Sequence, residues 1–214
     1  MAFKIILIGA GGHCSACIDV IEVTNDFEIV GIIDVEEKIG QYVLGYPIIG
    51  QDKDLVKFAR KDVWFLITLG HTGNSTLTKK IFTLLENVNA NIATVISKSA
   101  VVSKYSKIGR GTIIMNHVNI GPNTKIGYNC IINTNANIDH GTIIGNHNHI
   151  STHATINGSC VLEDEVFIGS NTTIFQGITI IKTVIVGAGS VVSKSLTEIG
   201  IYYGNPLVKK INYV

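Results

Sequence analysis

The sequence predicts two consecutive folds: a small Rossmann-like α/β domain with a parallel sheet over residues 1–95, and a parallel β-helix over residues 96–195. A C-terminal tail, residues 196–214, follows. Three observations lead to this prediction. Apolar strand-like runs alternate with helical patterns in the first half, a glycine-rich turn follows the first run, and from residue 96 an aliphatic residue recurs at every sixth position.

The composition is that of a folded protein. Hydrophobic residues make up 46% of the 214 residues and charged residues 15%, whereas disorder requires the opposite balance. The formal net charge is +1 and no run of Lys or Arg occurs, so neither nucleic acid nor a membrane surface is expected as a partner. The apolar run at residues 5–8 is too short for a signal peptide or a membrane span. We therefore expect no membrane insertion, a cytoplasmic location and reduced cysteines.

The first half is expected to form strands at residues 5–8, 28–34, 63–69 and 91–95, with helices at 15–23, 52–60 and 75–86. Asp52 stands where it can cap the second helix. Because each strand is followed by a helix, the strands should lie parallel in one small sheet.

Parallel sheets of this kind bind ligands at the carboxyl ends of their strands. Three groups meet that condition, namely the turn at residues 9–13, Asp34 and Gly70. Backbone N–H groups of the turn can hold a phosphate at a helix N-terminus, and Asp34 can accept hydrogen bonds from a ribose or a uracil-like edge. The alternatives are a nicotinamide-dinucleotide site, although Cys14 replaces the third glycine of that fingerprint, and a turn without a ligand.

The repeat in the second half is regular over a hundred residues. Seventeen consecutive sixth positions carry only Ile, Val or Leu: Ile96, Val102, Ile108, Ile114, Ile120, Ile126, Ile132, Ile138, Ile144, Ile150, Ile156, Leu162, Ile168, Ile174, Ile180, Val186 and Val192. This period matches neither an α-helix nor a coiled coil. A turn former often follows the aliphatic residue, as at Gly109, Gly121, Gly127, Asp139, Gly145, Glu163, Gly169 and Gly187, and a small or β-branched residue stands four positions after it.

The pattern predicts a triangular column. Six residues form one short strand and one corner, three such sides close a coil, and coils stack about 4.8 Å apart. The aliphatic and the small residues should point inward, and the turn formers should lie where the backbone bends. Residues 96–195 then give roughly five to six coils of three sides.

Several motifs recur together in one known family. They are Ile8-Gly9-Ala10-Gly11-Gly12-His13, Gly45-Tyr46-Pro47-Ile48-Ile49-Gly50, Asn137-Ile138-Asp139-His140-Gly141, Ile150-Ser151-Thr152, Asn157-Gly158 and Gly204-Asn205-Pro206, together with the hexapeptide frame. In these features the chain resembles the sugar O- and N-acyltransferases typified by the sialic-acid O-acetyltransferase (NeuD) and the UDP-4-amino-sugar N-acetyltransferases. The resemblance covers nearly the whole chain.

The resemblance implies a left-handed β-helix, a homotrimer, acetyl-CoA in the groove between neighbouring columns, and a nucleotide sugar held by the N-terminal domain. It places the catalytic histidine at His140 and a histidine facing the acetyl carbonyl at His149. Further residues expected to line the acetyl-CoA groove are Gly158, Gly187 and Ala188. The sugar-nucleotide site is expected at Gly11, Gly12, His13 and Asp34 by resemblance, and at Gly9 and Gly70 from their place at strand ends.

Acyl transfer from a thioester requires a deprotonated nucleophile and stabilisation of the carbonyl oxygen. We expect His140 to take the proton of a sugar amine or hydroxyl as it attacks acetyl-CoA directly. No acyl-enzyme is expected, since no cysteine stands at a recognisable spacing from a base. Amino-sugar members often carry a carboxylate directly after the histidine, where this chain has Gly141. The preceding acid, Asp139, is expected at a corner and not to face His140.

Other functions remain open. A zinc site from His147, His149 and His153 is conceivable, but the three lie at different positions of the coil, and no metal is expected. Cys14 and Cys17 form a C-x-x-C pair without a second pair. The chain could also be a structural column, or a binding module trimerised by the β-helix, with His117, His147 and His153 as surface residues.

The substrate is the least determined part of the prediction. The first choice is N-acetylation of a nucleotide-linked 4-amino-4,6-dideoxy sugar for bacterial surface glycans. The alternative is O-acetylation of a sialic acid, which Gly141 favours. Neither the base of the nucleotide nor the acyl chain length follows from the residues.

Overall fold

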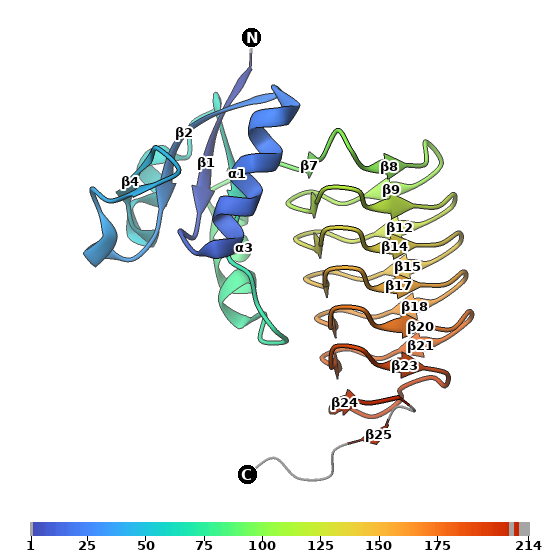
Figure 1. The fold of residues 1–214 in the computed structure, drawn as a ribbon. Helices are drawn as coiled ribbons and strands as arrows, with labels where there is room; N and C mark the ends of the chain where they lie inside the picture. The colour runs from blue at the N-terminus through green and yellow to red at the C-terminus, as the bar shows by residue number, and fades with distance from the viewer. Residues whose placement is uncertain (1, 206–207, 210–214) are drawn as a thin grey trace. The chain divides into compact units, whose positions relative to one another are not determined.

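The computed structural model describes residues 2–205 and 208–209. The chain forms two compact units (Figure 1). One consists of the chain up to Gly70 together with Thr76–Lys98, and the other of His71–Ser75 together with the chain from Ser99 onward. The short segment His71–Ser75 thus connects two elements of the first unit while it belongs to the second.

The first unit is built on a sheet of the order β3-β4-β2-β1-β5-β6. Its pairs are parallel except the hairpin β3–β4. The elements in chain order are β1 (Phe3–Ile8), α1 (Gly12–Thr24), β2 (Phe27–Ile33), the 3-10 turn η1 (Glu36–Lys38), β3 (Tyr42–Val43), β4 (Tyr46–Gly50), the 3-10 turn η2 (Asp52–Asp54), α2 (Leu55–Phe58), β5 (Val63–Ile67), α3 (Thr76–Asn87) and β6 (Asn91–Ile92). The chain builds outward from β1 first through β2 and β4, then through β5 and β6. The strand order therefore reverses beside β1, where sheets of this kind bind ligands.

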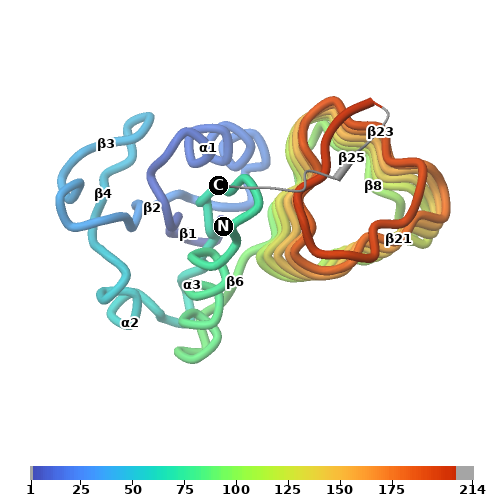
Figure 2. Tube along the Cα trace, turned by 90° about the horizontal axis from the view of Figure 1, so that it is seen from below, coloured from blue at the N-terminus to red at the C-terminus, as the bar shows by residue number. Residues whose placement is uncertain are grey.

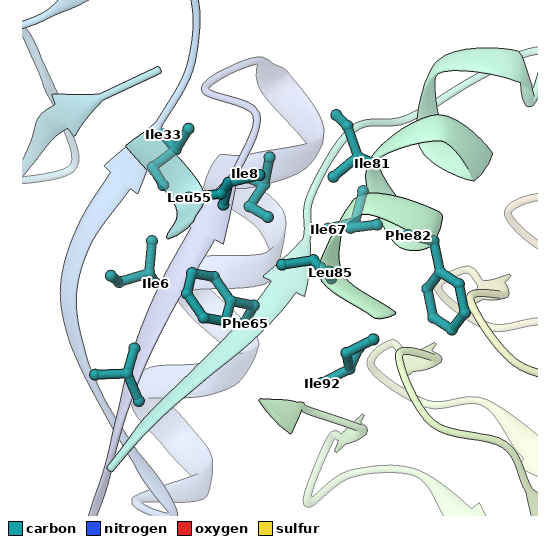
Figure 3. Close-up of a cluster of buried hydrophobic side chains, with 11 residues drawn as sticks. Ile6, Ile8, Ile33, Leu55, Phe65, Ile67, Ile81, Phe82, Leu85 and Ile92 are labelled. Carbon is teal, nitrogen blue, oxygen red and sulfur yellow. The ribbon is translucent and has the colours of Figure 1, made fainter. Parts of the chain in front are cut away.

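One cluster of the core of this unit lies between the sheet and α3 (Figure 3). Alternate residues of β1 point to opposite faces of the sheet, so Ile6 and Ile8 face α3 while Ile5 and Leu7 face the other side. On the α3 side, Phe65 packs in the same cluster as Phe82, and both are at most 1% exposed. This packing fixes the strand ends that carry the glycine-rich turn.

In this unit one hairpin was not predicted and one predicted helix was wrong. Residues 46–50 form β4, which pairs with β3 in a hairpin. The sequence did not predict this hairpin, because strands this short show little periodicity. The helix predicted at 52–60 begins as a 3-10 turn and continues only over Leu55–Phe58. Its start is held by Asp54, whose Oδ2 accepts the Gln51 backbone N–H at 3.1 Å, and Asp52 is left free of that role.

The second unit is the predicted left-handed β-helix. From β7 to β23 every side of a coil carries a two-residue strand, and in the described residues the strands form three sheets. One sheet contains β7 (Val95–Ile96), β10 (Ile113–Ile114), β13 (Ile131–Ile132), β16 (His149–Ile150), β19 (Phe167–Ile168), β22 (Ile185–Val186), β24 (Ile201–Tyr203) and β25 (Val208–Lys209). The next contains β8 (Val101–Val102), β11 (Asn119–Ile120), β14 (Asn137–Ile138), β17 (Thr155–Ile156), β20 (Thr173–Ile174) and β23 (Val191–Val192). The third contains β9 (Lys107–Ile108), β12 (Lys125–Ile126), β15 (Ile143–Ile144), β18 (Val161–Leu162) and β21 (Thr179–Ile180).

The register confirms the predicted coil of three six-residue sides. Ile132 pairs with Ile150 and Ile138 with Ile156, each 18 positions apart. Seen along the stack, successive coils superimpose (Figure 2). From Ile114 to Val192 every aliphatic residue of the frame is at most 4% exposed. Ile96 is 38% exposed because it lies in the first strand of the stack, where no coil precedes it.

The glycines of the repeat have a different role from the predicted one. The bend is made three positions after the aliphatic residue, where φ is positive in most coils, for example 58° at His117 and 60° at Asn123. The glycines one position after the aliphatic residue are required by close packing between coils. A Cβ on Gly127 would lie 2.6 Å from the carbonyl oxygen of Gly145 in the next coil. Glycine is needed there because the backbones of adjacent coils approach so closely.

Replacing Gly127 with Ala should destabilise the β-helix by about 1–3 kcal/mol, because the neighbouring backbone cannot move away from the new methyl group. The measurement is the denaturation midpoint of the variant. Gly189→Asn is the matched control. Gly189 has φ 69°, and a Cβ added there meets nothing within 4 Å. Asn tolerates this conformation, so the control should change stability by less than about 0.5 kcal/mol. Equal losses in both variants would contradict the close-packing explanation.

Among the described residues, no helix has both the length and the apolar character needed to cross a membrane.

Candidate functional site

The glycine-rich turn lies between the end of β1 and the start of α1. Gly9 has φ 107°, and a Cβ on it would collide with the side chain of Leu69. Gly11 is the N-cap of α1 and offers no side-chain acceptor to the first turn. A Cβ on Gly11 or Gly12 would meet nothing within 4 Å. The turn therefore leaves the N-terminus of α1 open on the side where an anion would bind.

Asp34, directly after β2, fixes this turn. Its Oδ2 accepts the Ala10 backbone N–H at 2.5 Å, and its Oδ1 accepts the Val35 backbone N–H at 2.7 Å. Lys38 Nζ lies 3.1 Å from Oδ1. Burial alone would raise the pKa of Asp34, but the two backbone donors and Lys38 outweigh it, and the pKa is lowered. Asp34 is thus an ionised carboxylate that holds the turn in place, in addition to any contact it makes with a ligand.

The lowered pKa of Asp34 gives the first unit an acid-sensitive contribution to stability. The ordinary value is 3.8, and the folded value lies below it, so the contribution is present above about pH 4. It is lost as the pH falls through the folded value, because the unfolded chain then binds the proton more readily. In Asp34→Asn, stability should depend less on pH below about pH 4 than in the parent chain. Denaturant titrations at stepwise lower pH measure this, and parallel curves for the two proteins would contradict it.

His13 and Gly70 lie together beside the turn. A Cβ on Gly70 would come within 3.3 Å of the His13 Cβ, so the strand end after β5 passes closely over α1. His13 Nε2 lies 3.5 Å from Cys17 Sγ. Burial raises the pKa of Cys17 well above that of an ordinary thiol, and that of Cys14 is also raised. These thiols are protonated and buried, so the C-x-x-C pair behaves as part of the core.

His140 lies in an open cavity of about 520 Å³ on the corner that follows β14. Its side chain is 62% exposed. A Cβ on Gly158, one coil further on, would lie only 2.5 Å from the imidazole Cε1, so the ring rests directly against Gly158. The cavity is lined by Asp139, His140, Asn157, Gly158, Ser159, Phe175, Gln176 and Gly177.

The expectation that Asp139 does not face His140 was wrong. Its Oδ1 accepts the His140 backbone N–H at 2.7 Å, which turns the carboxylate toward its neighbour. Oδ2 then lies 3.8 Å from His140 Nε2. This is too long for a hydrogen bond, but it places the carboxylate directly beside the imidazole. Gly141 has φ 68°, a left-handed backbone conformation that glycine adopts without strain. This conformation explains why glycine follows the histidine directly.

His149 lies on β16 and is 7% exposed. Its Nδ1–H donates to the backbone oxygen of His71 at 2.6 Å, and the Asn133 side-chain amide lies 3.3 Å from Nε2. The ring packs edge-on against Phe167, with ring centres 5.2 Å apart. Burial lowers the pKa of His149, although the hydrogen bond to His71 opposes the shift. In one chain His149 is a packed, neutral side chain that holds the segment His71–Ser75.

The predicted acetyl-CoA residues do not all meet on one chain. Gly158 touches His140 on the corner between β17 and β18. Gly187 and Ala188 lie on another corner, between β22 and β23. Gly187 donates its N–H to the Tyr202 oxygen at 2.7 Å and packs against Tyr203.

The remaining histidines and cysteines of the β-helix have structural positions. His117, His147 and His153 each have a positive φ and form corners. His117 and His153 are exposed, but His147 is only 8% exposed, so the expectation that it lies on the surface was wrong. No three His, Cys, Asp or Glu side chains within residues 2–205 and 208–209 are arranged to hold a metal. Cys130 and Cys160 point inward and are at most 1% exposed, as predicted.

Sequence reasoning missed most of the residues around His140, among them Gln176 and Phe175. The signal that could have found them is the length of one full coil. Residues 18 and 36 positions after His140 stack on it, which gives Gly158 and Gln176. It also missed Asp52, which was expected to be a helix cap and instead lines a small cavity with Gly9 and Asp34.

Comparisons with known proteins match both halves of the chain. Residues 4–85 match the family model described as the PglD N-terminal domain, and residues 70–151 match the one described as GlmU-like, C-terminal hexapeptide. A UDP-N-acetylbacillosamine N-acetyltransferase of Bacillus subtilis is 31% identical over 115 residues, which is 52% of this chain and 51% of that protein. The match thus spans about half the length of that relative.

Among the solved structures that are similar to this chain, two illustrate a match over nearly its whole length. The first is PerB from Caulobacter crescentus in complex with CoA and GDP-perosamine, with 27% identity, a TM-score of 0.89 and 97% of each chain covered. The second is the acetyltransferase domain of PglB from Neisseria gonorrhoeae in complex with acetyl coenzyme A. It has 23% identity and a TM-score of 0.89, and the match covers 98% of this chain and all of that one. At that identity the second likeness concerns the fold alone.

Proposed function

Since this chain belongs to the sugar O- and N-acyltransferases with a hexapeptide-repeat left-handed β-helix, we propose that it transfers an acetyl group from acetyl-CoA to the amino group of a nucleotide-linked amino sugar. The match to PerB covers 97% of this chain and 97% of PerB, and PerB was solved with CoA and a nucleotide-linked amino sugar. The observation that carries the proposal for this chain is the exposed His140 imidazole, held against Gly158 in an open cavity with the Asp139 carboxylate beside it.

In the proposed reaction the sugar amine attacks the carbonyl carbon of the thioester. His140 takes the proton that the amine loses, the bond between the carbonyl carbon and sulfur breaks, and CoA leaves as the thiol after taking up a proton. The Asp139 carboxylate, whose Oδ2 is 3.8 Å from His140 Nε2, lies beside the imidazolium that forms in the first step. No acyl-enzyme takes part, since Cys130 and Cys160 are buried and burial raises the pKa of Cys130 to about 12.

The proposed acetyl-CoA site runs along Gly158, Gly187 and Ala188. Because Gly187 and Ala188 lie on a different corner of the column from His140, one CoA molecule in contact with all of them requires a second chain. A homotrimer with CoA in the groove between columns meets this requirement. The packed state of His149 argues for a structural role, and a backbone N–H of the groove is the better candidate to stabilise the carbonyl oxygen.

The proposed sugar-nucleotide site comprises the turn at Gly9, Gly11, Gly12 and His13, with Asp34 and Gly70 beside it. The open N-terminus of α1 suits the pyrophosphate, because its amides and its dipole favour negative charge. O-acetylation of a sialic acid rested on Gly141. Gly141 has a positive φ, a conformation that favours glycine whatever the substrate is. Its presence therefore no longer favours a sialic acid.

The test is CoA release from acetyl-CoA in the presence of amino sugars linked to GDP, UDP or dTDP, with CMP-sialic acid as the hydroxyl acceptor. We expect release with at least one nucleotide-linked amino sugar and a product heavier by one acetyl group in mass spectrometry. Release only with the sialic acid would replace N-acetylation by O-acetylation. Absence of release with every acceptor would overturn the enzymatic proposal.

A further inference from the structure

The first coil leaves one end of the β-helix column uncovered. β8 and β9 are the terminal strands of their sheets and lie at the end of the stack (Figure 1), so no coil covers their outer edge. The inward side chains of Val102 and Ile108 are therefore partly exposed. On the outside of the same coil, Val101 is 67% exposed and Tyr105 is 65% exposed. Apolar surface from the inside and the outside of the column thus meets water at this end.

The charge around this end is of one sign. None of the 16 acidic residues of the chain lies between Glu86 and Asp139, whereas that stretch contains the bases Lys98, Lys104, Lys107, Arg110 and Lys125. The formal net charge of +1 conceals this asymmetry, because acids elsewhere in the chain balance these bases. Lys107 and Lys125 are direct neighbours in adjacent coils. Like charges so placed repel each other, and an anionic partner would relieve that repulsion.

The lysines of this end are available to such a partner. Lys104, Lys107 and Lys125 are exposed, and none of them forms an ion pair within the part of the chain that the structure describes. Lys104 Nζ lies 5.1 Å from the centre of the Tyr105 ring, so cationic and aromatic groups share one surface. A lysine can lay its methylene groups along apolar surface while its charge stays in a polar layer.

We infer that this end of the column binds the surface of an anionic lipid membrane. The residues that carry the inference form what we call the basic end: Val101, Lys104, Tyr105, Lys107 and Lys125. Anionic headgroups attract the lysines, and the boundary of the acyl chains takes up the apolar side chains. Tyrosine suits this boundary because its ring is apolar and its tip is polar. The binding is peripheral and does not depend on the proposed function, since none of these residues lines the His140 cavity.

Other occupants fit this surface less well. Nucleic acid would attract the lysines, but its charged backbone offers no apolar layer to Val101 and the open interior of the coil. A second copy placed end to end would bring the same positive charges together. Only a lipid surface offers negative charge and apolar contact over the same area.

The experiment measures co-sedimentation of the full-length protein with vesicles of phosphatidylcholine, with or without about one third phosphatidylglycerol. The parent should bind the anionic vesicles, and binding should weaken as salt is raised. The double variant Lys104→Gln and Lys107→Gln should bind about 25-fold more weakly, since each base near an anionic surface contributes about fivefold. Tyr105→Ser should weaken binding by the same factor at low and high salt, because its contribution is not ionic.

The matched control is the double variant Lys182→Gln and Lys194→Gln. It removes the same charge from two exposed lysines of the last coils, beyond β21 and β23. We expect it to bind anionic vesicles like the parent. Equal losses in the two double variants would mean that net charge acts rather than the basic end, which overturns the inference.

The remaining outcomes also decide. Absence of parent binding to anionic vesicles overturns the inference, and so does tighter binding of a DNA duplex through the same lysines. Self-association of Lys104→Gln with Lys107→Gln, at unchanged lipid affinity, would show that these lysines only keep column ends apart. Both double variants should release CoA like the parent in the absence of vesicles. A raised KM for acetyl-CoA in the first would assign its lysines to CoA instead. Failure of lipid binding leaves the proposed acetyl transfer untouched.

Discussion

Replacing His140 with Ala is expected to reduce the turnover of acetyl transfer by about 10²–10⁴-fold, the usual contribution of a general base. The fold should be unaffected, because the side chain is 62% exposed and its backbone N–H keeps the hydrogen bond to Asp139. The measurement is kcat in a CoA-release assay with saturating acetyl-CoA and amino-sugar nucleotide. KM should change little, since the lost interaction belongs to the reacting proton rather than to substrate binding.

The matched control for this variant is His117→Asn. His117 is an exposed histidine of the same β-helix that forms a corner with φ 58°, a conformation that Asn accepts. We expect its turnover to stay close to that of the parent chain. If His140→Ala turned over normally, or if both variants lost activity alike, His140 would not be the base.

Replacing Ile144 with Ala is expected to lower the free energy of unfolding of the β-helix by about 2–5 kcal/mol. Ile144 is 2% exposed and fills the column from β15. Its loss removes apolar contacts and leaves a cavity that stacked coils cannot close, because each backbone is hydrogen-bonded to the coils before and after it. Chemical denaturation followed by the circular dichroism of the strands measures the change.

Ile143 provides the control within the same two-residue strand. It points outward and is 43% exposed, so Ile143→Ala should cost less than about 1 kcal/mol. The two variants remove the same atoms from adjacent positions, and only the direction of the side chain differs. Similar losses would mean that the inward and outward positions of the frame have been assigned the wrong way round.

The sequence by itself determined the β-helix. Its aliphatic residues recur with one period over a hundred residues, and a side chain at such a spacing can be buried only if every side of the coil has six residues. The pairing of Ile138 with Ile156 follows from the same arithmetic. In the first unit the sequence determined the parallel sheet and the turn at Gly9, because a buried strand, a glycine and a helix follow one another directly.

Only the tertiary structure decided what depends on neighbours in space. The reason for Gly127 is the backbone of the next coil, and the partner of His140 is a carboxylate turned by its own hydrogen bond. The position of Asp52 in the same cavity as Asp34 depends on β4 and α2. Both elements are too short to leave a period in the sequence. Periodicity reports which side chains are buried, but it carries no information about which polar groups from distant segments meet.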